Sequence, residues 1–405
     1  MHQILTSEPI PPLSPEPPRR DTWDRILIIT GSLGLGLGMA TAAALGLLSI
    51  FAKQPIALGV EAASIFVLGL LGAPAIYWGA KGSADRAVRR PGSAWILAML
   101  LYPLALVLGI LAFEVGTLTR VLGPIAHIIA AGAPVLFVIS ISLTRGPLLS
   151  ARRRWAHFLA GLWVTPPLSL FLELVTVVLF GLLMILGLAF APDGQSLIQE
   201  LLEIDLSSQS EVVNLMERLL TQPIVILLGV GLLSGAVPLI EEFLKTITIW
   251  PRLGRPMTAS AAFLGGALGG AGYALFESLF LPQPGEEWAI TMVARAGTPL
   301  IHAFNTGLVC WGLAEGVRRR RWLFFAGTYI LAVGLHGMWN LAAIGIGLSG
   351  LGIETEASTL DPSLLTAVGY LGLLGLVGLT VGSLAGLIWL PARLDSGASD
   401  LPRRT

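Results

Sequence analysis

The sequence predicts an all-α, polytopic membrane protein of about ten transmembrane helices, and three observations support this. Hydrophobic residues make up 54% of the 405 residues and charged residues only 12%, whereas a soluble domain carries about 25% charge. Ten apolar segments approach or exceed the roughly 20 residues that a helix needs to cross a bilayer. Arginines gather in alternate loops, as in multi-pass proteins. We therefore expect an integral, multi-pass protein of the cell membrane, in contact with the lipid bilayer.

One of the ten expected spans has to be divided. The fifth apolar segment is too long for a single straight crossing, and Pro166 and Pro167 interrupt it. Because proline disfavours the interior of a helix, residues 155–165 are expected to form an interfacial lead-in and residues 168–190 the crossing. The ten spans are residues 26–52, 56–80, 94–113, 121–143, 157–190, 223–250, 258–281, 296–317, 322–347 and 364–391.

The arginines predict how the spans are oriented. The loops at residues 81–93, 144–156, 251–257 and 318–321 are rich in basic residues, whereas the alternate segments are acidic. Basic residues in short loops mark the cytoplasmic side, so these loops and both termini are expected there. The expected regions are a disordered cytoplasmic tail (1–22), a five-helix N-terminal membrane region (23–192), an extracytoplasmic amphipathic segment (193–222), a four-helix membrane core (223–347), an outer loop with the last transmembrane helix (348–391) and a cytoplasmic tail (392–405).

Charge and cysteine content exclude several kinds of site. The 25 basic residues balance the 25 acidic ones, and they are scattered in short loop clusters, so no basic face is available to bind nucleic acid. Cys310 is the single cysteine and lies in an apolar run, which excludes a disulfide framework and a thiolate metal site. Nucleic acid is therefore not an expected partner.

Carboxylates lie inside two apolar spans of the four-helix core. An ionisable side chain in the middle of a span costs about 2.5 kcal/mol or more, so such residues are rare and usually functional. Span six contains Glu241, Glu242 and Lys245, and span seven contains Glu277. Glu241 and Lys245 are four residues apart and can pair on one helix face. Taken alone, this pair fits a neutralised structural ion pair as well as it fits a functional group.

Imidazoles follow in the next two spans. Span eight has His302 and Thr306 one turn apart, and span nine has His336 and Asn340 at the same spacing. Imidazole and carboxylate are common zinc ligands, and a catalytic zinc has three protein ligands and an open position for water. Four consecutive spans thus each supply an acid or an imidazole, which independent structural residues would not be expected to do.

Two other features of the spans, a further carboxylate and a series of glycines, indicate a function less specifically. Glu173 lies deep in span five without an evident partner, and we interpret it as structural or accessory. Span seven carries a series of small residues that permits close helix packing and would bring Glu277 toward its neighbours. These glycines are Gly265, Gly266, Gly269, Gly270 and Gly272.

At the residues of the four-helix core the sequence resembles the PrsW family of intramembrane proteases, which is related to the CAAX-protease and bacteriocin-processing group. The resemblance rests on the order of four motifs and covers about residues 235–345; the five-span front half lies outside it. The motifs are EExxK at Glu241 to Lys245, aromatic-xxx-Glu at Tyr273 to Glu277, an arginine followed by HxxxT at Arg295, His302 and Thr306, and HxxWN at His336, Trp339 and Asn340.

The resemblance implies a protease that hydrolyses peptide bonds of membrane-anchored or membrane-associated protein substrates, within or beside the bilayer. In this interpretation, Glu277, His302 and His336 hold zinc or another divalent metal. Glu241 or Glu242 takes the proton of the attacking water. The remaining roles are charge stabilisation of the glutamate pair by Lys245, orientation of His336 or oxyanion binding by Asn340, and accessory functions of Tyr273, Arg295 and Thr306.

Alternative interpretations of the same residues stay open at this point. A glutamate and a histidine could activate water directly, without a metal. A membrane transporter also uses buried carboxylates and Gly- or Pro-interrupted helices, and a non-catalytic binding or regulatory protein could keep the polar residues. Straight spans would place the candidate residues at different depths, so we expect a tilt, a kink or an outward extension of span six near Gly229, Gly231, Gly235 and Pro238, and a polar cavity open to the outer side.

Overall fold

The computed structural model describes most of the chain, and the described part is almost entirely helical, with no strand in it. The termini at 1–21 and 397–405, which are most of the two tails expected to be cytoplasmic, lie outside the described residues. The described ranges are 22–51, 55–81, 92–114, 119–191, 194–205, 208–220, 222–280, 284–285, 287–354 and 362–396.

The helices follow one another with short connections. Helical segments that are not α-helical are labelled η. In chain order the elements are α1 (Thr22–Phe51), α2 (Pro55–Leu70), α3 (Gly72–Lys81), α4 (Ala94–Glu114), α5 (Thr119–Arg145), α6 (Ala151–Leu159), η1 (Ala160–Val164), α7 (Thr165–Leu188), α8 (Gly194–Glu203), α9 (Gln209–Leu220), α10 (Pro223–Gly231), η2 (Leu232–Ala236), α11 (Val237–Leu244), η3 (Lys245–Thr248), η4 (Trp250–Arg252), α12 (Ala259–Phe280), α13 (Trp288–Ala294), α14 (Thr298–Arg319), α15 (Trp322–Glu354) and α16 (Pro362–Ser396).

Nine helical stretches of the described chain are long and apolar enough to cross a membrane. They correspond to nine of the ten expected spans, and the protein is a multi-pass integral membrane protein. The expected span at residues 296–317 is the exception: it coincides with α14, which is 22 residues long but is not among the nine. The helix is mostly buried in the protein and carries Asn305 and Glu315 besides its histidine and threonine. Burial among other helices, rather than apolar composition, accommodates α14.

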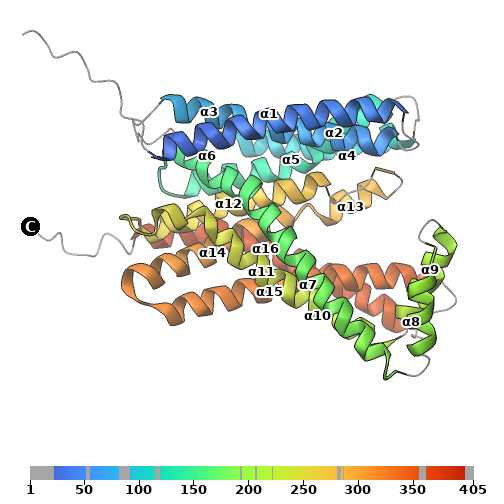
Figure 1. Cartoon of the computed structure of the whole chain (residues 1–405). Helices are drawn as coiled ribbons and strands as arrows, with labels where there is room; N and C mark the ends of the chain where they lie inside the picture. Colours follow the sequence, from blue (N-terminus) through green and yellow to red (C-terminus); the bar gives the residue numbers. More distant parts are fainter. Residues whose placement is uncertain are drawn as a thin grey trace, which may run out of the picture.

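The helices form two groups on either side of α12 (Figure 1). Helices α1 to α5 lie on one side, and α14, α15 and α16 lie on the other. Helix α12 contacts both groups, since it packs against α14 and α16 as well as against α2, α5, α6 and η1. Most of its side chains are buried. The helix that carries Tyr273 and Glu277 is thus the centre of the molecule.

Glycines allow the neighbours of α12 to approach closely, as the small-residue pattern predicted. A Cβ on Gly161 of η1 would lie 1.8 Å from the carbonyl oxygen of Gly269. A Cβ on Gly266 would lie 2.4 Å from the carbonyl oxygen of Thr306, and one on Gly270 would lie 2.3 Å from that of His302. Since real Cβ contacts of this length do not occur, α12 packs backbone to backbone against both η1 and α14.

The fifth span differs from the expectation at its two prolines. Helices α6, η1 and α7 run continuously from residue 151 to residue 188. The chain passes through a π-helical turn at η1, and Pro166 and Pro167 then fall in the first turn of α7, where a missing N–H costs little. The prolines therefore do not divide the helix, because the irregularity is absorbed by the π turn before them.

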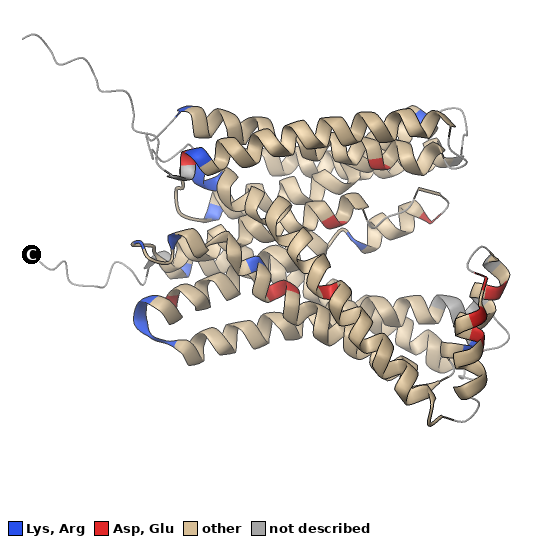
Figure 2. Cartoon of the chain, in the orientation of Figure 1, with Lys and Arg blue, Asp and Glu red and all other residues tan. Residues whose placement is uncertain are grey.

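The amphipathic segment between spans five and six consists of two short helices, α8 and α9. Leu197 of α8 and Leu215 and Leu219 of α9 pack against Leu188 at the end of α7. The opposite faces are acidic, and they lie at the end of the molecule away from most arginines (Figure 2). This separation of charge along the long axis agrees with the expected orientation, which stays a prediction.

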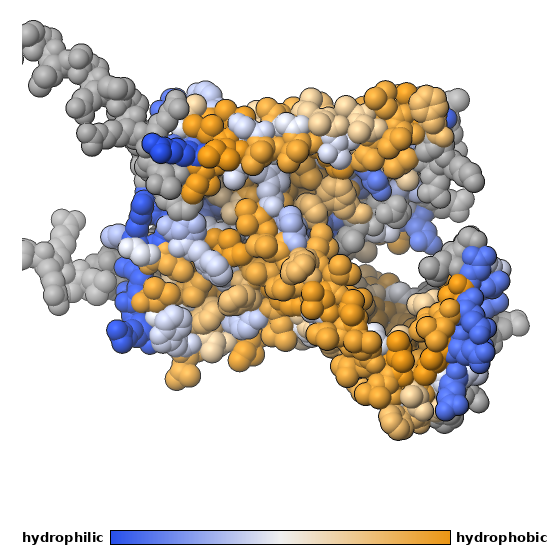
Figure 3. Space-filling view, viewed as in Figure 1, coloured by the Kyte–Doolittle hydropathy of each residue, from blue (hydrophilic) through white to orange (hydrophobic). Residues whose placement is uncertain are grey.

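The two helix groups diverge toward the end that carries α8 and α9. In Figure 1, α7 and α10 lead away from α1 to α5. The space-filling view shows a recess on this face between the α8–α9 end and the α1–α5 group (Figure 3). The recess leads from the acidic end of the molecule toward the middle of the helices.

Candidate active site

The stretch that carries the glutamate pair is irregular on both sides of it. A π-helical turn, η2, precedes α11, and the 3₁₀ turn η3 begins at Lys245. Pro238 removes a backbone donor in the first turn of α11. Gly337 of α15 approaches there as well, because a Cβ on it would lie 2.2 Å from the carbonyl oxygen of Ser234. The expected break in span six is therefore present as a π turn, which rotates the following glutamates relative to a regular helix.

Lys245 lies at the centre of the polar cluster. Its Nζ donates to Oε2 of Glu241 at 2.8 Å, to Oε1 of Glu242 at 2.9 Å and to Nδ1 of His302 at 2.8 Å. The lysine side chain is fully buried. The ring of Tyr273 lies 4.2 Å from Nζ and adds a cation–π contact. One buried ammonium thus has two carboxylates, an imidazole and an aromatic face around it.

His302 connects this cluster to Glu277 of α12. An ammonium has donors only, so Nδ1 of His302 accepts from Lys245 and the neutral ring carries its proton on Nε2. That Nε2 lies 2.8 Å from Oε2 of Glu277, to which it donates. Arg295 lies 3.1 Å from the same Glu277 oxygen. Glu277 therefore fixes the ring of His302 and is itself balanced by an arginine.

His336 of α15 contacts the glutamate pair from the other side. Its Nδ1 donates to Oε1 of Glu242 at 2.9 Å, which leaves Nε2 as the nitrogen with a lone pair. Nε2 lies 4.0 Å from Oε2 of Glu241, too far for a direct hydrogen bond. The rings of His336 and His302 meet edge to face with centroids 5.0 Å apart. The two histidines and two glutamates therefore surround one small volume.

Glu242 and Thr306 each have a buried polar atom without a hydrogen-bond partner among the described residues. Oε2 of Glu242 is buried and has no hydrogen bond with the described part of the chain. The same holds for Oγ1 of Thr306, one turn after His302. A buried acceptor without a partner costs about 1–3 kcal/mol, so such an atom calls for an explanation, such as a catalytic role or a bound water or ion. The sequence placed Thr306 among the accessory residues, and the structure keeps it one turn from His302.

Asn340 has a partner away from the histidines. Its Nδ2 donates to the carbonyl oxygen of Leu233 at 2.7 Å, inside the π turn η2. Tyr329 of the same helix donates to the carbonyl oxygen of Leu239 at 2.7 Å. Helix α15 therefore satisfies backbone carbonyls of the irregular stretch. In this structure the amide of Asn340 holds the backbone before the glutamate pair. From the sequence, its expected role was to orient His336 or to bind an oxyanion.

Glu173 of α7 adds a carboxylate to the site that the motifs did not include. Its Oε1 is buried and forms no hydrogen bond with any described residue. It interacts electrostatically with Glu241, Lys245 and Glu277. Ser169, one turn earlier on α7, lies beside the Tyr273 hydroxyl. The only available signal in the sequence was an ionisable residue deep in a span, without a motif to give it a role.

The donor atoms fit a divalent cation in kind and in spacing. One ligand atom from each of Glu241, Glu242, His302 and His336 lies within 4.8 Å of the others. Carboxylate and imidazole are ligands of zinc and of other divalent metals, and the unpartnered Glu242 oxygen offers a free lone pair. Glu277 is outside this group, since it contacts the far nitrogen of His302. The ammonium of Lys245 contacts three of the four residues, so it takes the position that such a cation would fill.

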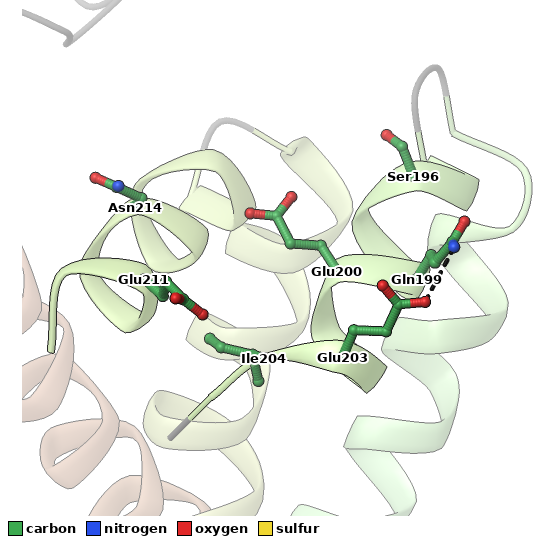
Figure 4. A pocket seen from close by; sticks show the side chains of 7 residues that line it. All are labelled: Ser196, Gln199, Glu200, Glu203, Ile204, Glu211 and Asn214. Atoms are coloured by element: carbon green, nitrogen blue, oxygen red, sulfur yellow. Dashed lines mark hydrogen bonds between the residues drawn. The ribbon is translucent and has the colours of Figure 1, made fainter. Parts of the chain in front are cut away.

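A polar pocket lies on the α8–α9 pair and contains no residue of the buried cluster (Figure 4). Its carboxylates have partners: Glu200 pairs with Arg218, and Glu203 accepts from Gln199 at 3.0 Å. Glu203 is solvent-exposed, and Glu200 is partly exposed. We therefore assign the candidate active site to the buried cluster and treat this pocket as part of the outer surface.

Comparison with known families agrees with the motifs. Residues 206–366 match the model of the PrsW family intramembrane metalloprotease. The resemblance seen in the sequence is thereby confirmed over this range, which contains both glutamates of α11, Lys245, Glu277 and both histidines. No curated protein and no solved structure matches the chain. Helices α1 to α8, including Glu173, lie outside the matched range.

Proposed function

We propose that this protein is an intramembrane endopeptidase that hydrolyses peptide bonds of membrane-anchored or membrane-associated protein substrates. The observation that carries the proposal is the convergence of Glu241, Glu242, His302 and His336, from three separate membrane helices, around one buried volume. Such groups are costly to bury in a bilayer, so those that occur there usually have a function. The family match to a metalloprotease supports the same reaction class.

In this proposal Glu241 is the general base. A water between Oε2 of Glu241 and Nε2 of His336, which are 4.0 Å apart, can donate a hydrogen bond to each. Glu241 is slightly exposed at 5%, whereas Glu242 is fully buried, so Glu241 is the carboxylate that water reaches more readily. Proton transfer to Glu241 would leave the hydroxide beside His336, ready to attack a carbonyl carbon.

Glu242 and Glu277 have positioning roles in the proposal. Glu242 holds Lys245 and His336 through the same oxygen, Oε1. Glu277 accepts from Nε2 of His302 and so directs Nδ1 toward the glutamate pair. A carboxylate that accepts a hydrogen bond from one ring nitrogen of a metal-binding histidine commonly orients that histidine. Glu277 has this relationship to His302.

We further propose that a divalent metal, zinc or another, is held by donors drawn from Glu241, Glu242, His302 and His336. When bound, such an ion would supply Lewis acidity toward the water and the peptide carbonyl. The ammonium of Lys245 would have to leave its present contacts for this to happen. If Lys245 stays, the glutamate and histidine act on water directly, and the ammonium supplies the positive charge.

The substrate must reach the cluster in an extended form, because a helical segment shields its carbonyl groups by internal hydrogen bonds. The recess between the two helix groups is the proposed route (Figure 3). In this route a substrate segment enters from the acidic end of the molecule, passes α7 and meets Glu241.

The test is a comparison of membrane proteomes from cells that produce the wild type, Glu241→Gln or Glu242→Gln at equal levels. Glutamine keeps the shape of the side chain and removes the base. We expect protein fragments with new termini in or near transmembrane segments for the wild type and for the control Glu203→Gln, which makes the same change on the exposed α8. Full cleavage by both active-site variants, or no wild-type cleavage together with solute uptake that the variants lose, would reject the protease.

A further inference from the structure

A groove runs along the surface between α1 and the α6–η1–α7 helix, on the opposite side of η3 from the polar cluster. It encloses about 400 Å³. One wall consists of successive turns of α1, from Ile26 to Leu37. The other wall consists of α6 and η1, and the chain from Ile247 to Arg255 closes its arginine-rich end.

The length of the groove matches one leaflet of a bilayer. Ile26 and Leu37 are eleven positions apart on α1, which corresponds to roughly 16 Å at 1.5 Å per residue. The hydrocarbon of a bilayer is about 30 Å thick, so one leaflet measures roughly 15 Å. The wall that α1 contributes is thus long enough to accommodate an acyl chain of one leaflet.

The walls of the groove are apolar and open. Leu33 and Leu37 of α1 are 57% and 65% exposed, and Val164 on the facing wall is 38% exposed. Gly34 lets the indole of Trp163 lie against α1, because a Cβ there would be 2.6 Å from the ring. The glycine and the tryptophan bring the two walls of the groove into contact. The exposed apolar side chains of its walls suit a hydrocarbon chain.

Four arginines line one end of the groove. Arg152 and Arg153 reach it from α6, and Arg252 and Arg255 reach it from the chain after η3. Arg152 pairs with Asp24. Burial lowers the pKa of Arg252 below its usual value, and the nearby charges of Arg255 and Arg152 lower it further. The guanidinium groups therefore repel one another, and an anion placed among them would relieve this repulsion.

We propose that the groove binds one anionic phospholipid, with its phosphate among Arg153, Arg252 and Arg255 and an acyl chain along Leu33 and Leu37. Basic pockets between membrane helices on the side that the arginines mark as cytoplasmic recognise anionic head groups. A neutral lipid would find the same apolar walls without the charge match. The occupant is thus defined by two features together, an anionic head group and a chain one leaflet long.

The proposed lipid site would also stabilise the backbone next to the candidate active site. The groove is lined by His157 and Thr248, and Nδ1 of His157 lies 2.8 Å from the carbonyl oxygen of Thr248. Thr248 ends the 3₁₀ turn that begins with Lys245. A lipid held by Arg252 and Arg255 would hold the chain that leaves this turn, next to the residue at the centre of the polar cluster.

The test counts lipids retained on the purified full-length protein by native mass spectrometry, with phosphatidylglycerol or phosphatidylcholine added. We expect one phosphatidylglycerol to bind in preference to phosphatidylcholine. Removing two groove charges in the double variant R252Q/R255Q should lower the affinity for phosphatidylglycerol about 30-fold, at about 1 kcal/mol per charge. The control R318Q/R320Q removes two exposed arginines outside the groove and should retain the lipid.

A second pair of variants tests the apolar part with every charge in place. Leu33→Trp fills the groove and should reduce phosphatidylglycerol retention, whereas Leu174→Trp adds the same bulk on the exposed face of α7 and should not. Equal retention of both lipids, equal losses in the two double variants, or full retention by Leu33→Trp would each overturn the proposal. None of these readouts depends on proteolysis, so they are independent of the proposed activity.

Discussion

His302 donates from Nε2 to the carboxylate of Glu277 at 2.8 Å while its Nδ1 accepts from Lys245 at the same distance. The ring is therefore held in one tautomer and one orientation. If Glu277 acts by orienting His302, then Glu277→Gln should lower the rate of cleavage about 10- to 100-fold, as is usual for partners of ligating histidines. The variant should keep its thermal stability within a few degrees, since Gln can still accept the hydrogen bond.

The control for this prediction is Arg295→Gln, which leaves the His302 contact intact and removes the charge beside Glu277. It should have a smaller effect on cleavage than Glu277→Gln. Cleavage at the wild-type rate by Glu277→Gln, measured on the same substrate, would show that the orientation of His302 does not depend on this carboxylate.

Lys245 and a divalent metal compete for the same donors in our proposal. Removing the ammonium with Lys245→Met leaves Glu241 and Glu242 buried without a partner of opposite charge, which typically costs about 3–5 kcal/mol. We expect a lower melting temperature for this variant in the presence of a chelator and recovery on addition of zinc. The metal content after dialysis should exceed that of the wild type.

The wild type is the reference for this measurement, and the triple variant E241Q/E242Q/K245M is the control without carboxylate donors. It should neither bind zinc nor be stabilised by it. A Lys245→Met protein whose melting temperature and metal content do not respond to zinc would favour direct water activation by Glu241 and His336, without a metal.

Much of this arrangement follows from the sequence. Apolar length identifies nine of the helices, and the four motifs contain most of the residues that meet at the cluster, although not Glu173. The convergence itself depends on irregular backbone: the π turn at Leu232–Ala236 sets the rotation of Glu241 and Glu242. Glycine and proline in that stretch indicate a break, but not its type, because several kinks use the same residues.

The sequence predicted which residues lie at the site better than it predicted which side chains contact one another. Lys245 was expected to pair within its own helix, and its contact with His302 depends on how α11 and α14 are rotated toward each other. Glu173 faces the cluster because α7 packs on α11, a contact between segments that share no motif. The carbonyl partner of Asn340 exists only because the π turn exposes it. Hydropathy could not identify α14 as buried, since its polar residues make it less apolar than its neighbours.

Glu173 gives a prediction in which stability and activity change in opposite directions. Its buried Oε1 has no hydrogen-bond partner in the described chain, and Glu241 and Glu277 are nearby charges of the same sign. Glu173→Gln removes the unfavourable charge and should raise the melting temperature. If Glu173 exchanges protons with the site, the same variant should reduce turnover without changing substrate affinity. Unchanged turnover would limit Glu173 to a structural role.

The orientation of the chain can be tested by labelling single cysteines with a membrane-impermeant maleimide. Cys310, the single native cysteine, is buried and can be replaced by Ala as the background. Glu287→Cys lies before α13, and Arg320→Cys lies between α14 and α15 at the opposite end. We expect Glu287→Cys to react on intact cells and Arg320→Cys to react only after permeabilisation. The reverse pattern would place the arginine-rich loops outside.

The contact between α12 and α14 determines where His302 lies, and a single methyl group tests it. A Cβ on Gly270 would lie 2.3 Å from the carbonyl oxygen of His302 and 2.8 Å from Oγ1 of Thr306. Gly270→Ala must therefore push α14 away from α12. Overpacking of this kind typically costs about 1–3 kcal/mol. The displacement would also move His302 relative to Lys245 and Glu277, so cleavage should fall more than the loss of folded protein explains.

The matched control is Gly132→Ala in α5, where a new Cβ would meet nothing within 4 Å. There the gain in helix propensity of about 0.5–1 kcal/mol should dominate, so the variant should be slightly more stable and fully active. Melting temperature and cleavage rate per folded molecule, measured for both variants, separate packing from catalysis. Wild-type activity in Gly270→Ala would mean that α14 can shift without moving the imidazole, and that the backbone contact with α12 does not set the geometry of the cluster.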